Sequence, residues 1–224
     1  MKNQEQEDHI GFIRKVLGIV ASQMALTFAF SLAASANEPT GRLFKSPTVQ
    51  ILSIIGYLAG MITLFCSKPI RRSVPLNYIL LLVVTVSLAS MIAGVAAEFK
   101  ALSVITAIMA CCISTAGLFV AAMFTSTRIN VMRNLVFGLV AAAILNLIVL
   151  LMMIFTMRMN DPGLVFAISL IMVVVVGIYI IFDLLQIIIP GIVDKDDYIF
   201  AALQLYIDIA YLFYYLLLLL GERK

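Results

Sequence analysis

The stretch YIIFDLLQIIIPGIVDKDDYIFAALQLYIDIAYLFYY, residues 179–215, contains two long apolar runs separated by a Pro-Gly turn and a short charged segment. Each run holds one acidic residue, Asp183 in the first and Asp208 in the second. A carboxylate at membrane depth costs on the order of 2.5–3.5 kcal/mol on insertion scales, so such a residue usually has a partner and a function. Whether the two runs cross a membrane follows from the rest of the chain.

The composition is that of a membrane protein. Of the 224 residues, 63% are hydrophobic and 12% are charged, and the mean hydropathy is +1.13. These values lie outside the range of soluble globular proteins. The net charge of +3 is spread along the chain without a polybasic block, which excludes nucleic-acid binding.

Seven segments are long and apolar enough to cross the membrane as helices, since about 20 residues are needed. Pro, Gly and charged residues separate them and favour helix ends in water. We therefore predict an all-α, polytopic fold with a polar cytoplasmic segment at 1–15, a membrane domain at 16–221 and a short tail at 222–224. The predicted spans are 16–36, 48–66, 74–97, 101–124, 135–157, 164–189 and 198–220.

Lysine and arginine in the loops predict the orientation, because cytoplasmic loops carry an excess of both. With the N-terminus in the cytoplasm, nine basic residues lie inside and four lie in outside loops. The inside set is Lys2, Arg14, Lys15, Lys68, Arg71, Arg72, Arg128, Arg133 and Lys195, and the outside set is Arg42, Lys45, Lys100 and Arg158. Seven spans then place the C-terminus on the far side, whereas a re-entrant last segment would return it to the cytoplasm.

Several classes of chemistry are not supported by the residues. The single histidine, His9, lies in the polar N-terminal segment, and the three cysteines have no metal-binding or redox spacing. No nucleophile-base arrangement is apparent, so we predict that the protein is not an enzyme and needs no resident cofactor. The first apolar run is too long for a cleaved signal peptide and is expected to act as a signal anchor.

Counting residues from the turn at Pro190 and Gly191 places the two acids at compatible depths. Asp183 precedes Pro190 by seven residues, and Asp208 follows Asp197 by eleven. At about 1.5 Å per residue these depths are roughly 10 and 16 Å, a mismatch of about one helical turn that tilt can absorb. The two carboxyl groups can therefore meet across a helical hairpin, where they would share a proton and titrate as a unit.

Such a pair has two interpretations. It can be a pH-sensitive latch that binds Ca²⁺ weakly and transiently, since Ca²⁺ prefers six to eight oxygen ligands and permeation requires weak binding. Alternatively, the acids only hydrogen-bond two helices together. Arg14, Arg71 and Arg72 are candidate counter-ions, although all three also fit an anchoring role at the membrane surface. The acidic run at 194–197 is expected to be a solvated turn or a region that concentrates cations.

The same residues resemble the transmembrane Bax inhibitor motif family, which includes the Bax inhibitor and lifeguard proteins. The most specific matches are YIIFDLLQI at 179–187 and DDYIFAALQLYIDIAYLFYYLLLLLG at 196–221. Supporting matches are GFIRKVLGIVASQMALT at 11–27 and VPLNYILL at 74–81. The resemblance implies seven helices with the C-terminal helix in the centre.

The resemblance also implies a role for the acidic residues. Asp183 and Asp208 fall on a pair of aspartates that senses pH and closes a calcium leak pathway, and Arg71 or Arg72 falls near an arginine that can pair with the first of them. The expected function is a pH-sensitive Ca²⁺ leak channel that regulates intracellular calcium and cell death. The alternative is a non-conducting structural or interaction subunit of a larger membrane assembly. The expected location is an intracellular membrane, either the endoplasmic reticulum or the Golgi, with the mitochondrial inner membrane as a further option.

Overall fold

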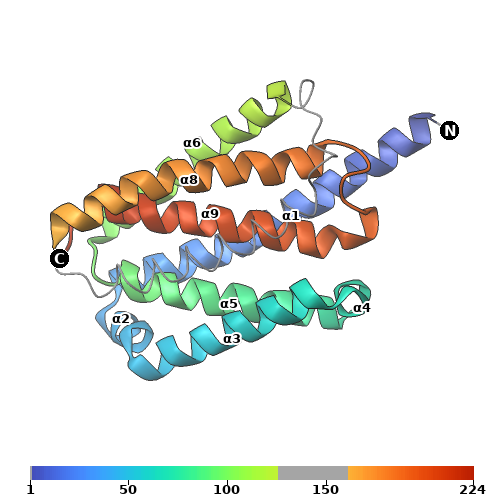
Figure 1. Cartoon of the computed structure of the whole chain (residues 1–224). Helices are drawn as coiled ribbons and strands as arrows, with labels where there is room; N and C mark the ends of the chain where they lie inside the picture. Colours follow the sequence, from blue (N-terminus) through green and yellow to red (C-terminus); the bar gives the residue numbers. More distant parts are fainter. Residues whose placement is uncertain (1, 126–160) are drawn as a thin grey trace.

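The structure, a computed structural model, describes residues 2–125 and 161–224, and these residues form a bundle of α-helices (Figure 1). The predicted span 135–157 lies outside the described residues. The helices are α1 (Lys2–Ala36), α2 (Glu38–Lys45), α3 (Pro47–Cys66), α4 (Lys68–Arg72), α5 (Leu76–Ala96), α6 (Ala101–Thr125), α8 (Pro162–Ile188) and α9 (Tyr198–Leu220), with a short 3₁₀ helix, η2 (Lys195–Asp197), before α9.

Six of the described helices are long and apolar enough to span a membrane, which confirms the predicted all-α membrane fold. They are α1, α3, α5, α6, α8 and α9. Large apolar side chains remain exposed on the outer helices, among them Leu52 of α3, Leu102 of α6 and Ile171 of α8. Such exposed apolar surfaces are unusual on soluble monomers. In a membrane they contact the acyl chains of lipids. The chain is therefore an integral membrane protein.

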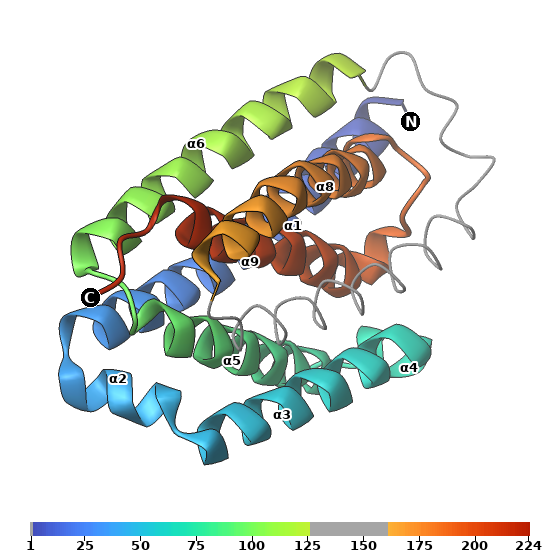
Figure 2. The ribbon, with the colours of Figure 1, turned by 60° about the vertical axis from the view of Figure 1, so that its left-hand side comes forward.

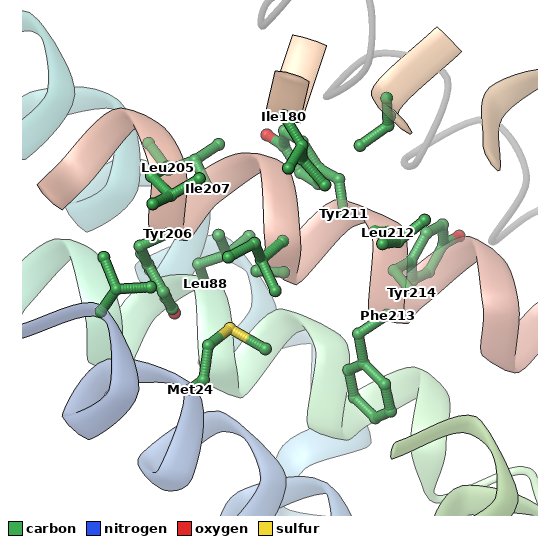
Figure 3. Close-up of a cluster of buried hydrophobic side chains, with 14 of the residues drawn as sticks. Met24, Leu88, Ile180, Leu205, Tyr206, Ile207, Tyr211, Leu212, Phe213 and Tyr214 are labelled. Atoms are coloured by element: carbon green, nitrogen blue, oxygen red, sulfur yellow. The ribbon is translucent and has the colours of Figure 1, made fainter. Parts of the chain in front are cut away.

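The C-terminal helix α9 lies at the centre of the bundle, as predicted. It packs against α1, α5, α6 and α8, and these helices surround it in both views (Figures 1 and 2). Every residue from Ile199 to Leu217 is buried except Asp208, which is partly buried. Figure 3 shows the core around α9, where Met24 of α1 and Leu88 of α5 lie close to Tyr206.

Local sequence signals set the ends of the hairpin that carries the two acids. Asp161 caps the start of α8, because its Oδ1 accepts a hydrogen bond from the backbone N–H of Gly163 at 3.0 Å. At the other end α8 stops at Ile188, Pro190 follows, and Gly191 takes a φ of 85°. Glycine adopts this left-handed conformation without steric cost, so the chain can reverse into η2 and α9.

The observed helices differ from the predicted spans in the polar regions. Helix α1 already begins at Lys2, so the backbone of the predicted polar segment 1–15 continues the first span as one helix. The segment lacks Pro and contains residues that favour helix, such as Gln, Glu and Lys. Two breaks between predicted spans also contain short helices, α2 and α4, each with Pro near its first turn. The two termini lie at opposite ends of the bundle (Figure 1).

Candidate functional site

The side chains of Asp183 in α8 and Asp208 in α9 approach one another closely enough to share a hydrogen bond. Asp183 is 4% exposed and lies in the last third of α8. Asp208 is the single partly exposed residue in an otherwise buried stretch of α9. Carboxylates accept hydrogen bonds but cannot donate them, so this contact requires a proton on one of the two groups. Loss of that proton would leave two like charges in contact at membrane depth.

An amide extends the pair toward one end of the bundle. The Nε2 of Gln186 donates a hydrogen bond to Oδ1 of Asp183 at 3.2 Å, and Gln186 is itself 4% exposed. Gln186 also lines a cavity of about 320 Å³ at the end of the bundle where α8 and α9 are connected. A continuous set of polar side chains therefore leads from this cavity through Gln186 to Asp183 and Asp208.

Two of the three arginines predicted as counter-ions, Arg71 and Arg72, lie at the same end, but their ion pairs in the described part of the chain are with the α8–α9 turn rather than with Asp183. Arg72 donates to both oxygens of Asp197, with 3.1 Å from Nε to Oδ1 and 3.1 Å from Nη2 to Oδ2. Its Nη2 also donates to Oδ2 of Asp194 at 2.7 Å. These bonds, the Asp197 ones foremost, raise the pKa of Arg72 above its usual value. Arg71 lies closest to Asp197 as well, with 3.9 Å between Nε and Oδ1.

The solvated turn predicted at 194–197 is therefore correct for its first three residues and wrong for the fourth. Asp194, Lys195 and Asp196 are exposed, whereas Asp197 is 7% exposed. Pairing with Arg72 stabilises the charge of the buried Asp197. The prediction was wrong for this residue because loop composition does not show which acid of a run will have an arginine partner. Arg14 is exposed on α1 at the same end, and no ion pair involving it occurs among the described residues.

A second polar contact lies one turn beyond Asp208 along α9. The hydroxyl groups of Tyr211 and Tyr57 are 2.9 Å apart, and both side chains are fully buried. A stripe of polar residues with spacings of four, three and four residues marks one face of α9: Gln204, Asp208, Tyr211 and Tyr215. Sequence reasoning missed the role of Tyr211, although this helical spacing from Asp208 could have indicated it.

A further polar network joins α1, α5 and α9 on another face of the central helix. The Nε2 of Gln23 donates to Oγ1 of Thr85 at 2.7 Å, and the hydroxyl of Tyr206 donates to the backbone oxygen of Thr85 at 3.2 Å. Thr27 completes the network with 3.0 Å between its Oγ1 and the hydroxyl of Tyr206. Such hydrogen bonds hold transmembrane helices together, typically by about 0.6 kcal/mol each. Gln23 thus has the helix-joining role expected for a membrane amide.

The carboxyl pair offers few oxygen ligands for a cation. In residues 2–125 and 161–224 there is no group of three or more His, Cys, Asp or Glu side chains that could hold a metal ion. The two carboxyl groups and the amide oxygen of Gln186 supply fewer protein oxygens than the six to eight that Ca²⁺ prefers. A Ca²⁺ ion at this point would have to keep part of its water shell.

Comparison with known proteins matches this chain to a protein family. The family model described as inhibitor of apoptosis-promoting Bax1 matches residues 9–224. Protein lifeguard 3 of Mus musculus is 24% identical over 221 residues, which cover 95% of this chain and 69% of the relative. Protein lifeguard 3 of Homo sapiens is also 24% identical, over 222 residues, with the same coverage.

Proposed function

The chain belongs to the family described as inhibitor of apoptosis-promoting Bax1, and on that premise we propose that it is a pH-sensitive Ca²⁺ leak channel that regulates intracellular calcium and cell death. The observation that carries the proposal is the close approach of the carboxyl groups of Asp183 and Asp208 at membrane depth, with Gln186 hydrogen-bonded to Asp183. Two acids in contact inside an apolar bundle cost free energy. Ionisable residues at this depth therefore usually belong to a functional site.

In the proposed mechanism, the shared proton holds the gate closed. With one proton present, the hydrogen bond ties the central helix α9 to α8. When the proton leaves, the two carboxylates repel one another, and a hydrated cation can replace the proton between them. Gln186 would orient Asp183 and connect the pair to the cavity at the end of the bundle. We place that end, with the N-terminus, on the cytoplasmic side of an intracellular membrane.

The polar residues around the pair support this mechanism. The cavity at one end reaches Gln186, and the hydroxyl pair of Tyr57 and Tyr211 lies on the other side of Asp208. A cation leaving the carboxyl pair toward the far side would next meet these hydroxyl oxygens. Hydroxyl and carboxyl oxygens are the ligands that hard cations prefer.

The decisive experiment measures Ca²⁺ flux from proteoliposomes at about pH 6 and about pH 8. We expect greater flux at the higher pH, because deprotonation opens the gate. Asp208→Asn and Asp183→Asn should each abolish the pH dependence, since an amide cannot lose the shared proton. Glu38→Gln is the matched control, because it removes an exposed carboxylate whose partner is Arg42 on the same short helix. Unchanged pH dependence in both aspartate variants would refute the mechanism.

The alternative function, a non-conducting subunit of a larger membrane assembly, uses the same hydrogen bond only as a helix contact. It predicts that the aspartate variants lower stability without altering any flux. It also predicts that gentle solubilisation yields a stoichiometric complex with other membrane proteins. A monomeric protein that conducts Ca²⁺ would decide in favour of the channel.

A further inference from the structure

The cavity next to Gln186 contains a buried arginine whose charge is only weakly compensated. Arg71, in α4, is 6% exposed and lines the cavity together with Lys68 and the apolar side chains of Phe65 and Phe200. The Nε of Arg71 has no hydrogen-bond partner in the described part of the chain. Its guanidinium carbon lies 4.3 Å from the ring centre of Phe200, a cation–π contact that supplies no hydrogen-bond acceptor to the Nε.

The acids of the cavity are already occupied by a different arginine. Both oxygens of Asp197 and one oxygen of Asp194 accept hydrogen bonds from Arg72, whereas Arg71 approaches Asp197 no closer than 3.9 Å. Together with Lys68, this cluster has three positive and two negative side chains. A buried, poorly paired charge is strongly unfavourable unless a further group compensates it.

The backbone fixes Arg71 in place. The Nδ2 of Asn77 donates to the backbone oxygen of Arg71 at 2.9 Å, and the N–H of Arg71 donates to the oxygen of Ser67 at 3.2 Å. Asn77 is 1% exposed, so this contact is protected from solvent. The backbone that carries the Arg71 side chain is therefore a supported turn at the end of the bundle.

We propose that this cavity binds a phosphate group, with Arg71 as its buried anchor and Lys68 as a second cation at its rim. The planar guanidinium matches phosphate oxygens with paired hydrogen bonds and a full opposite charge. Basic pockets between transmembrane helices at one membrane face commonly bind the head groups of anionic lipids. The apolar walls, which include Phe65, Ile192 and Phe200, suit the glycerol and first acyl carbons of such a lipid.

A bound phosphate has a consequence that rests on the proposed function. The cavity reaches Gln186, whose side chain contacts Asp183. An empty cavity presents the weakly compensated charge of Arg71 to any cation that approaches the carboxyl pair from this end. Phosphate binding cancels that charge, so it should increase Ca²⁺ flux at a given pH.

Binding is tested first, on the full chain in a neutral detergent, without any measurement of flux. The probes are a short-chain phosphatidic acid and inorganic phosphate, and the readouts are calorimetric titration and the shift of the thermal unfolding midpoint. Binding of the lipid alone assigns the site to a lipid head group. Binding of both assigns it to phosphate irrespective of source. Binding of neither overturns the proposal.

Variants locate the site. Arg71→Met should weaken binding at least tenfold, and Lys68→Met, at an exposed position, should weaken it about threefold. Arg14→Met is the control, because it removes an exposed arginine from the same end of the bundle. Equal losses in the Arg14 and Arg71 variants would overturn the proposal in favour of diffuse charge attraction.

Folding and function are separated by two further measurements. Without phosphate, Arg71→Met should unfold at the same or a higher temperature than the parent, because a poorly paired buried charge has been removed. If it fails to fold, Arg71 is structural, and Arg71→Lys and Lys68→Met still test binding. If Ca²⁺ flux does not respond to bound phosphate, the proposed regulation is rejected and the phosphate site still stands. If Ca²⁺ flux does not depend on pH, the gate formed by Asp183 and Asp208 is rejected.

Discussion

The two ends of the bundle both gather charged residues, but they do so in opposite ways. At the end that holds the N-terminus, Asp197 and Arg71 are buried and their charges act on one another through the protein. At the end that holds the C-terminus, the charges of Lys100 and Glu222 are exposed and meet at 2.7 Å in water. Charge at the first end shapes a cavity that leads to the carboxyl pair, whereas charge at the second end only flanks a backbone contact.

That backbone contact fixes the tail at 222–224, which follows Gly221 at the end of α9. The N–H of Lys100 donates to the oxygen of Glu222 at 3.0 Å, and the N–H of Lys224 donates to the oxygen of Glu98 at 2.9 Å. The Nζ of Lys224 also donates to the oxygen of Ser35 at the end of α1 at 2.8 Å. The tail thus secures the last turn of the central helix to the connection between α5 and α6. Substitutions in the buried ion cluster and in the exposed backbone contact of the tail should therefore change the stability of the protein by very different amounts.

The largest effect on stability is expected at the first end, from Asp197→Ala. This change leaves Arg71 without its nearest carboxylate and removes the carboxylate that binds Arg72 through both oxygens. Breaking a buried ion pair in this way lowers the free energy of unfolding by on the order of 3 kcal/mol. The measurement is the thermal unfolding midpoint in detergent without phosphate. Asp194→Ala is the control, because the side chain of Asp194 is 61% exposed and should matter far less. Equal effects of the two changes would show that burial does not distinguish them.

A smaller loss is expected at the second end, from Gly221→Ala. A methyl group at this position would overlap the backbone oxygen of Leu217 and the ring of Phe99. The tail can relieve the overlap by leaving its site, so the cost is limited to about 1–2 kcal/mol. Gly18→Ala is the matched control, since no atom lies near its added methyl and helix propensity favours alanine. We expect opposite signs for the two variants, and a stabilised Gly221→Ala protein would contradict the close packing of the tail.

The smallest effect is expected from the exposed pair of Lys100 and Glu222. The hydrogen bond from Lys100 lowers the pKa of Glu222 below its ordinary value of 4.5. A lowered pKa in the folded protein means that the pair stabilises at neutral pH and that this contribution is lost as pH falls through the folded-state pKa. Glu222→Gln should therefore cause a slight loss of stability at pH 7 and none in strong acid. A loss that persisted in acid would assign the effect to the amide rather than to charge.

Sequence reasoning predicted the membrane-spanning helices in the described residues because each depends on local properties. Apolar length identified α3, α5, α6, α8 and α9 within a few residues, and Pro-Gly at 190–191 marked the turn between the last two. The polar segments were harder, since α2 and α4 form where composition suggested loops. Short polar helices are stabilised by their attachment to neighbouring spans, which periodicity does not report.

The candidate site was predictable in part. Helical rise alone made Asp183 and Asp208 plausible neighbours, because two residues on consecutive antiparallel helices have depths that can be counted from one turn. The same count could not show that Tyr57 meets Tyr211, since the two lie 154 residues apart in sequence. Nor could it decide between Asp183 and Asp197 as the partner of the arginines, because that depends on where α4 folds against the start of α9.

By itself, the sequence determined that this chain crosses a membrane, that two acids lie within adjacent spans, and that its family is that of the Bax inhibitors. These properties follow from hydropathy, local spacing and motif, each of which acts over a few residues. Only the tertiary structure decided that Arg72 compensates Asp197 while Arg71 remains poorly paired in a cavity beside Gln186. The physical reason is that compensation of a buried charge depends on distances of a few ångströms between distant segments, and packing sets those distances.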